Sequence, residues 1–284
     1  MSEFYWLASY PKSGNTWFRA FLSNLTASER QPFSINMMET GDIASHREWL
    51  DDVLGFDTAD LTADEIDGLR HIVYRWTAAC GAHRYYKIHD ACVIDGLTDP
   101  AYLSGTLYIV RNPLDVAPSY ANQMDCSLDE AIRQMGSVDK TFCGSSQGIS
   151  LQVRQKLLSW SGHVASWLEA QGSALHVIRY EDMHETPLET FAGAVRFLGL
   201  SCDIPTIERA ISHSSFGELS AQEANSGFRE GLVAGRRFFR RGECGGWRDT
   251  LSVEQVKRIV TDHQHMMARF GYLDEALSWI SEDR

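Results

Sequence analysis

The chain has 284 residues, 44% of them hydrophobic, and a formal net charge of −12 at pH 7. A chain of this length can bury a substantial core, and we expect one α/β domain over residues 1–284. The negative charge argues against a general affinity for nucleic acid or anionic membranes, because these polyanions attract concentrated Lys and Arg. Any anion that the protein binds must therefore be captured locally.

The sequence also indicates a compartment. The apolar stretch at residues 4–8 is too short for the core of a signal peptide, and no later segment approaches the length of a membrane span. The six cysteines are scattered without a C-x-x-C pair, so neither a zinc site nor a disulfide framework is expected. We therefore expect a cytoplasmic protein.

Short apolar runs alternate with helical patterns along the chain. They lie at residues 4–9, 85–88, 106–110 and 174–178. Such runs are typical of buried parallel strands, and their alternation with helices predicts a central parallel sheet flanked by helices. Each run stops at a polar or charged cluster. Because functional residues gather at the carboxyl ends of parallel strands, these clusters are candidate sites.

Three segments lack strong strand signals. Residues 31–70 contain ten Asp or Glu against two Arg, and we interpret them as polar helices and loops laid over the sheet. A solvated face is the simpler interpretation of this acidic region, and ligand recognition is the alternative. Residues 142–150 and 220–237 have the composition of mobile loops.

The first apolar run leads into S-Y-P-K-S-G-N-T-W at residues 9–17, before a helix expected to begin near Thr16. Gly14 permits close backbone approach, the helix amides point at an anion, and Lys12 adds a positive charge. Further donors are Ser13, Asn15 and Thr16. The order G-K-[ST] of nucleotide triphosphatase loops is missing, which disfavours a magnesium-dependent kinase. The structural alternative is that the hydroxyls only cap the helix.

A second phosphate site is indicated where the third run ends. Arg111 follows that run directly, and Ser119 comes about two turns into a helix expected to begin near Pro113. The guanidinium offers a bidentate contact and the hydroxyl a single bond, so together they can hold a phosphate. The alternative is a structural salt bridge between Arg111 and Asp115.

A basic segment near the C-terminus stands out in so acidic a chain. Residues 236–247 read R-R-F-F-R-R-G-E-C-G-G-W, in which Arg236 is the first of four arginines. Arginine beside flexible glycine backbone suits a lid over an anion. An ordinary basic surface loop is the alternative.

The second apolar run ends in Lys87-Ile88-His89. Residues 87 and 89 alternate by two, so Lys87 and His89 project to the same side of the strand. Because an unperturbed histidine has a pKa of about 6.5, His89 can act as a neutral base at physiological pH. A structural histidine is the alternative, and the other nine histidines have no comparable context.

Together these segments resemble the cytosolic-type sulfotransferase family. They are similar to its motifs Y-P-K-S-G-T-T-W, K-T-H, R-N-P-x-D-x-x-x-S and R-K-G-x-x-G-x-W, in the same order and over most of the chain. The resemblance implies a P-loop-like fold and an enzyme that uses 3'-phosphoadenosine-5'-phosphosulfate (PAPS). Such an enzyme moves the sulfonate group to a hydroxyl of a small-molecule acceptor and releases adenosine 3',5'-bisphosphate (PAP).

The resemblance also implies a role for each candidate residue. The 5'-phosphosulfate is held by Lys12, Ser13, Gly14, Asn15 and Thr16. The 3'-phosphate is held by Arg111, Ser119, Arg240, Arg241 and Gly242. Trp17 and Phe216 sandwich the adenine, while Tyr180 and Ser214 contact its edge. In catalysis His89 is the base, Lys87 stabilises the sulfonate, and Lys12 stabilises the bridging oxygen. No metal is required.

Some positions depart from the family pattern. Asn15 replaces the usual first threonine, and Gly246 replaces the acid before the tryptophan. Residues 248–257 align with the family's dimer segment, but its final acid has become Lys257, so the oligomeric state stays open. The acceptor is also open, with its pocket walls expected at residues 31–85, 120–155 and 220–237. Competing hypotheses are a P-loop-like kinase and a non-catalytic nucleotide-binding protein.

Overall fold

The computed structural model describes residues 3–27, 31–81, 83–144, 148–231 and 237–282. Arg236 and parts of both expected mobile loops lie outside the described residues. The chain divides into two compact units. Unit 1 comprises Met1–Tyr10, Thr40–Ile109 and Met135–Val177, and unit 2 comprises Pro11–Glu39, Val110–Gln134 and Ile178–Arg284. The single domain expected over the whole chain stays a prediction.

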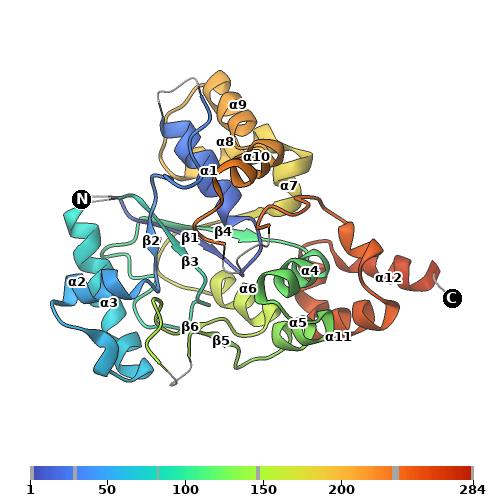
Figure 1. The fold of residues 1–284 in the computed structure, drawn as a ribbon, viewed down its shortest axis with the longest axis horizontal. Helices are drawn as coiled ribbons and strands as arrows, with labels where there is room; N and C mark the ends of the chain where they lie inside the picture. Colours follow the sequence, from blue (N-terminus) through green and yellow to red (C-terminus); the bar gives the residue numbers. More distant parts are fainter. Residues whose placement is uncertain (1–2, 28–30, 82, 145–147, 232–236, 283–284) are drawn as a thin grey trace. The chain divides into compact units, whose positions relative to one another are not determined.

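A parallel five-stranded sheet in the order β2-β3-β1-β4-β7 organises unit 1 (Figure 1). Its strands are β1 (Tyr5–Ser9), β2 (Gly41–Ile43), β3 (Tyr85–Ile88), β4 (Gly105–Val110) and β7 (Leu175–Arg179). β1 pairs in parallel with both β3 and β4, and every residue of β1 and β4 is buried. Burial of whole strands is typical of parallel sheets covered on both faces. The predicted α/β class and parallel sheet are confirmed.

The four predicted strands are all present, each within one residue of the expected bounds at either end. The fifth strand, β2, lies in the acidic region and was not predicted. It has three residues, is buried only at Gly41, and its register with β3 shifts between Gly41 and Ile43. A strand this short and irregular leaves no apolar run in the sequence.

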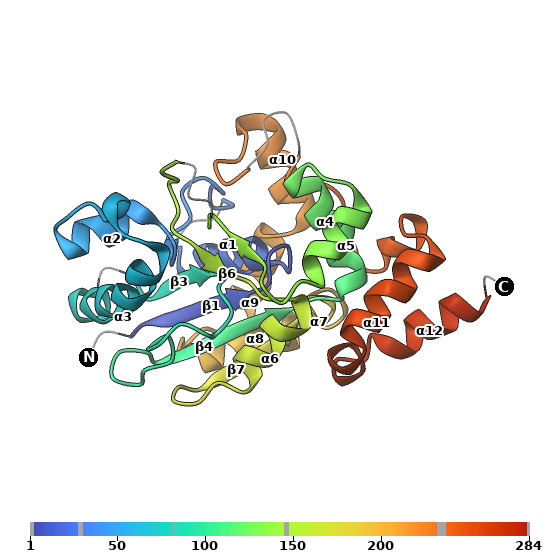
Figure 2. The same ribbon diagram turned by 90° about the horizontal axis from the view of Figure 1, so that it is seen from below.

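The remaining elements of unit 1 are α2 (Arg47–Leu54), η1 (Thr58–Asp60), α3 (Ala63–Cys80), α6 (Trp160–Leu168), β5 (Thr141–Phe142) and β6 (Gln155–Lys156). Strands β5 and β6 form an antiparallel pair. The helices α2 and α3 pack together, as Figures 1 and 2 both show. Thr62 and Glu65 close a capping box at the start of α3, which fixes where this helix begins.

Unit 2 is mainly helical. Its helices are α1 (Asn15–Thr26), α4 (Pro113–Met124), α5 (Leu128–Met135), α7 (Tyr180–Glu185), α8 (Pro187–Phe197), α9 (Ile204–His213), α10 (Phe216–Ser226), η2 (Gly246–Asp249), α11 (Val253–Arg269) and α12 (Leu273–Glu282). α1 packs against α9, and α11 packs against both α4 and α12. Within the described ranges, no helix is both long and apolar enough to cross a membrane.

The register of the sheet positions one part of the candidate site. Ala8 of β1 lies opposite Ile88 of β3 and Tyr108 of β4. The next residues along the first two strands, Ser9 and His89, are therefore neighbours at the carboxyl edge of the sheet. This edge is where parallel sheets place their functional groups.

Candidate active site

The loop after β1 has an unusual backbone. Lys12 has φ 70° and Gly14 has φ 103°, both in the left-handed region. A non-glycine residue in this region is uncommon and often marks a functional loop. Gly14 is the N-cap of α1, and no side-chain hydrogen bond caps this helix in the described structure. The alternative in which Ser13 or Thr16 only caps the helix is therefore wrong.

Several donors around this loop are buried with unmet hydrogen-bonding capacity. Ser13 Oγ, Trp17 Nε1 and Arg111 Nε are three of the buried side-chain atoms that lack a partner in the part of the chain that the structure describes. A buried polar atom without a partner is unfavourable, so each such atom needs an explanation. All three come from segments expected to hold the nucleotide. The residues present therefore fit an anionic, hydrogen-bonding ligand at this place.

Gly14 is under a steric constraint as well as a conformational one. A Cβ at this position would lie 2.6 Å from Cδ2 of the buried Tyr180 ring. Gly14→Ala should lower the free energy of unfolding by about 1–2 kcal/mol, the usual scale of a left-handed alanine. It should also weaken PAP binding, because the Tyr180 ring has to move.

Gly217→Ala is the matched control, since a Cβ there meets open space. Denaturant unfolding and PAP titration of both variants check the expectation. Wild-type stability and PAP affinity in Gly14→Ala would contradict it.

Arg111 links the separate motifs of unit 2. Its Nη1 donates to the Lys12 carbonyl (3.1 Å), and its Nη2 donates to the Glu243 carbonyl (3.0 Å). Its guanidinium also lies 4.0 Å from the centroid of the Tyr180 ring. One cation thus contacts the first loop, the late basic segment and the aromatic residue that follows β7.

Asp115 has a role that the sequence did not reveal. Its carboxylate accepts the backbone N–H groups of Gly245 (2.7 Å) and Trp247 (3.1 Å). The salt bridge considered as the alternative for Arg111 is therefore not the arrangement seen, because Asp115 anchors the late glycine-rich segment to α4. Trp247 is fully buried, which fixes the end of that segment.

Positive charge collects near the end of the late segment. Burial lowers the pKa of Arg240, and the nearby cations Arg241 and Arg111 lower it further. The lowered pKa of Arg240 reflects burial and repulsion from these two cations, and such a region of positive charge favours an anion. Ser119, the expected hydroxyl partner, is half-buried on α4, which begins at Pro113 as predicted.

The residues expected around the adenine also lie in unit 2. Trp17 and Phe216 are half-buried and pack against the same apolar cluster. The Trp17 ring lies 5.6 Å from the ring of Tyr180. Ser214 is fully buried, and its hydroxyl donates to the Ala210 carbonyl (2.8 Å). The adenine sandwich and the contact from Ser214 stay predictions.

His184 is an unexpected neighbour of Trp17. The two ring centroids are 4.6 Å apart. Burial lowers the pKa of His184, and the positive charge of Arg111 lowers it further. His184 therefore adds an uncharged ring, and no extra cation, to this aromatic surface near neutral pH.

The Lys12 ammonium group is held from two sides. It donates to Gln123 Oε1 (3.1 Å) and lies 3.7 Å from the centroid of the Phe238 ring. Gln123 was not among the predicted residues, and its neutral side chain orients Lys12 without cancelling its charge. These two contacts therefore orient the cation and leave its charge in place.

The expected base lies in unit 1, at the end of β3. Burial alternates along residues 87–90: Lys87 and His89 are half-buried, whereas Ile88 and Asp90 are buried. The predicted alternation is therefore confirmed. His89 Nδ1 lies 2.8 Å from the Ser9 carbonyl oxygen. Because a carbonyl can only accept, Nδ1 carries the proton of the neutral ring and Nε2 carries the lone pair. Nε2 is the atom that can take a proton from a ligand.

No group of three His, Cys, Asp or Glu side chains is arranged to hold a metal ion in the part of the chain that the structure describes.

Comparison with known proteins agrees with the motifs. A model of the sulfotransferase domain matches residues 102–271. Sulfotransferase 4A1 of Mus musculus is 24% identical over 268 residues, which cover 93% of this chain and 80% of that protein. Mouse sulfotransferase SULT7A1, solved in complex with PAP, has a TM-score of 0.62 at 18% identity and covers 99% of this chain and 89% of that one. Retinol dehydratase in a complex with retinol and PAP has a TM-score of 0.60 at 18% identity, and the match covers 93% of this chain and 80% of that one.

The domain match spans more than half of the chain, and the two structures share its fold. The chain therefore belongs to the sulfotransferase family. This confirms the resemblance drawn from the motifs and the predicted enzyme class, a PAPS-dependent sulfotransferase.

Proposed function

We propose that this protein transfers the sulfonate group of PAPS to the hydroxyl of a small-molecule acceptor, with His89 as the general base. The nucleotide would be bound through Lys12, Arg111 and the segment that ends at Trp247. The proposal assigns no metal, because the first loop lacks the G-K-[ST] order that magnesium-dependent phosphoryl transfer uses.

The observation that carries the proposal is the position of Arg111. It bonds the backbone of Lys12, 99 residues away in the sequence, and of Glu243, 132 residues away. Three segments that resemble the family's nucleotide-binding motifs thus meet around one guanidinium. An arginine on an ordinary solvated surface has no reason to bridge them. This supports a nucleotide site with anion contacts from all three segments.

In the proposed reaction a histidine removes a proton and two lysines stabilise negative charge. His89 Nε2 takes the proton of the acceptor hydroxyl, whose oxygen forms a new bond to sulfur. The bond from sulfur to the 5'-phosphate oxygen breaks, and the electron pair stays on that oxygen. Lys12 stabilises the charge that develops there, and Lys87 stabilises the transferring sulfonate. The products are a sulfate ester and PAP.

For the acceptor we propose a small molecule that carries a hydroxyl group. Retinol dehydratase, a structural neighbour, is described with retinol and PAP together. Retinol is an alcohol, which supports this general class without naming the acceptor of the present protein. A panel of phenols, aliphatic alcohols and sugars, assayed for transfer of labelled sulfonate, tests the proposal and narrows the class.

Arg111→Ala should weaken PAP binding about tenfold to a hundredfold, because each charge-assisted hydrogen bond is worth about 1.5–3 kcal/mol. The fall in kcat at saturating PAPS should be smaller, since the 3'-phosphate does not react. Arg258→Ala is the control, because Arg258 is an exposed arginine on α11. Titration calorimetry with PAP and steady-state kinetics separate the two effects. Unchanged PAP affinity in Arg111→Ala would contradict the assignment.

A further inference from the structure

One face of α6 holds the backbone that carries His89. His163 Nε2 lies 3.1 Å from the His89 carbonyl oxygen. Trp167 Nε1 donates to the next carbonyl along the chain (3.0 Å), and Ser166 Oγ accepts the N–H three residues beyond His89 (2.9 Å). The three side chains are spaced i, i+3 and i+4, so they lie on the same side of the helix. Residues 89–92 are thus fixed by side chains of a single helix.

The protonation state of His163 follows from its partners. It is fully buried, and burial lowers its pKa to about 4, so it is neutral near neutral pH. Since the His89 carbonyl can only accept, Nε2 of His163 carries the proton. Its Nδ1 then accepts the hydroxyl hydrogen of Tyr108 (2.8 Å), and the Tyr108 oxygen also bonds the backbone N–H of Tyr10. Both ring nitrogens of His163 are therefore occupied.

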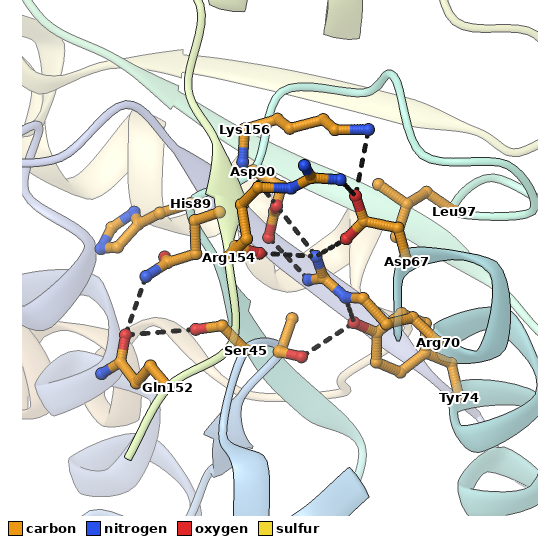
Figure 3. Close-up of polar contacts among 12 residues, drawn as sticks. Ser45, Asp67, Arg70, Tyr74, His89, Asp90, Leu97, Gln152, Arg154 and Lys156 are labelled. Atoms are coloured by element: carbon orange, nitrogen blue, oxygen red, sulfur yellow. Dashed lines mark hydrogen bonds and ion pairs between the residues drawn. The ribbon is translucent and has the colours of Figure 1, made fainter. Parts of the chain in front are cut away.

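A second set of contacts fixes the residue after His89. The Asp90 carboxylate accepts two hydrogen bonds from Arg70, at 3.0 and 2.7 Å, and one from the Lys156 N–H at 3.0 Å. Figure 3 shows this carboxylate directed toward Arg70, whereas the His89 ring points away from that pair. The His89 backbone is thus held on both sides, and its ring is set by the Ser9 carbonyl.

We infer that His163 is a positioning residue for His89: it holds the His89 carbonyl and so keeps the ring directed with Nε2 toward the acceptor. This inference rests on the proposed function, in which His89 is the base. His163 touches neither substrate in this account. Without its N–H, the His89 carbonyl loses a buried partner, and the segment that carries the base can shift.

The test compares His163→Ala with His163→Gln. Loss of the N–H should lower kcat about tenfold to a hundredfold, because a shift of about 1 Å in a catalytic group costs up to about a hundredfold. PAP affinity should not change, since the nucleotide contacts lie in other residues. Glutamine should restore most of the activity, because its amide can donate to the same carbonyl.

A double-mutant cycle with His89→Asn gives a readout that a merely structural role would not move. If His163 acts through His89, then His163→Ala should have little further effect on kcat in the His89→Asn background, measured with a nitrophenol acceptor. An equal loss in both backgrounds would overturn the inference. So would wild-type kcat in His163→Ala.

A second variant covers the case in which His163→Ala does not fold. Tyr108→Phe removes the hydroxyl that fixes the His163 tautomer. It should reduce kcat severalfold in the wild-type background and leave kcat unchanged in the His89→Asn background. Equal losses in both backgrounds would again overturn the inference. Failure of the proposed role of His89 looks different, because His89→Asn alone would then either keep wild-type kcat or lose PAP affinity and turnover equally.

Discussion

Replacing His89 with asparagine should lower kcat by roughly 10²–10⁴-fold, the usual scale for the loss of acid–base catalysis, with little change in PAP affinity. Asparagine is a sharper test than alanine, because its amide N–H can occupy the place of Nδ1 and still donate to the Ser9 carbonyl. It has no basic atom where Nε2 was. The variant therefore removes the base and keeps the local hydrogen bond.

The acceptor provides an internal check on the same variant. An acidic nitrophenol is already partly ionised near neutral pH and needs less help from a base, so its loss of rate should be smaller than that of an aliphatic alcohol. His265→Ala, an exposed histidine on α11, is the control for both acceptors. If His89→Asn lost PAP affinity and turnover equally, or were unstable, His89 would be a structural residue.

Asp90→Ala should lower the free energy of unfolding by about 3–5 kcal/mol, because it removes the carboxylate that accepts two hydrogen bonds from the buried Arg70 guanidinium and leaves only Asp67, at 3.6 Å, as an ion-pair partner in the described structure. Arg70 and Asp90 are both fully buried and lie 2.7 Å apart. Burial alone would lower the pKa of Arg70, but the Asp90 carboxylate raises it above its usual value, so Arg70 stays charged. The variant would therefore bury a charge that has lost its nearer carboxylate partner.

The exposed pair of Arg133 and Glu130 is the control for Asp90→Ala. Removing Arg133 should leave the unfolding midpoint unchanged, because solvent screens surface ion pairs. Chemical denaturation of both variants measures the difference. An Asp90→Ala protein as stable as the wild type would show that water or another group replaces the carboxylate.

Most of the sheet could be predicted, because each long strand is a buried apolar run. β2 could not, since three residues with a register shift have no such pattern. The solvated face expected at residues 31–70 is also wrong at several positions, because Thr58, Asp67 and Arg70 are among its buried polar residues. A charge pattern alone does not show which arginine has a distant counter-ion, and Asp90 is 20 residues away.

One part of the candidate site could also be predicted from the sequence, and another part could not. The first loop could be predicted because its donors are consecutive in the sequence and its chemistry is local. Asp115, Gln123 and His163 could not, because their partners lie 130, 111 and 74 residues away. Each of these residues could also have a purely structural role, so its presence in the sequence does not indicate a site. For His163 the available signal is a single histidine within the apolar pattern of α6, which usually indicates a core residue.

Transfer of labelled sulfonate from PAPS, assayed with the acceptor panel and with and without a magnesium chelator, tests the central claim most directly. We expect at least one hydroxyl-bearing acceptor to gain the label while PAP is released, at the same rate with the chelator present. The account would be contradicted if the protein bound PAP yet labelled no acceptor, the behaviour of a non-catalytic nucleotide-binding protein. Activity that the chelator abolished would contradict it too, and would favour metal-dependent chemistry of the kinase type.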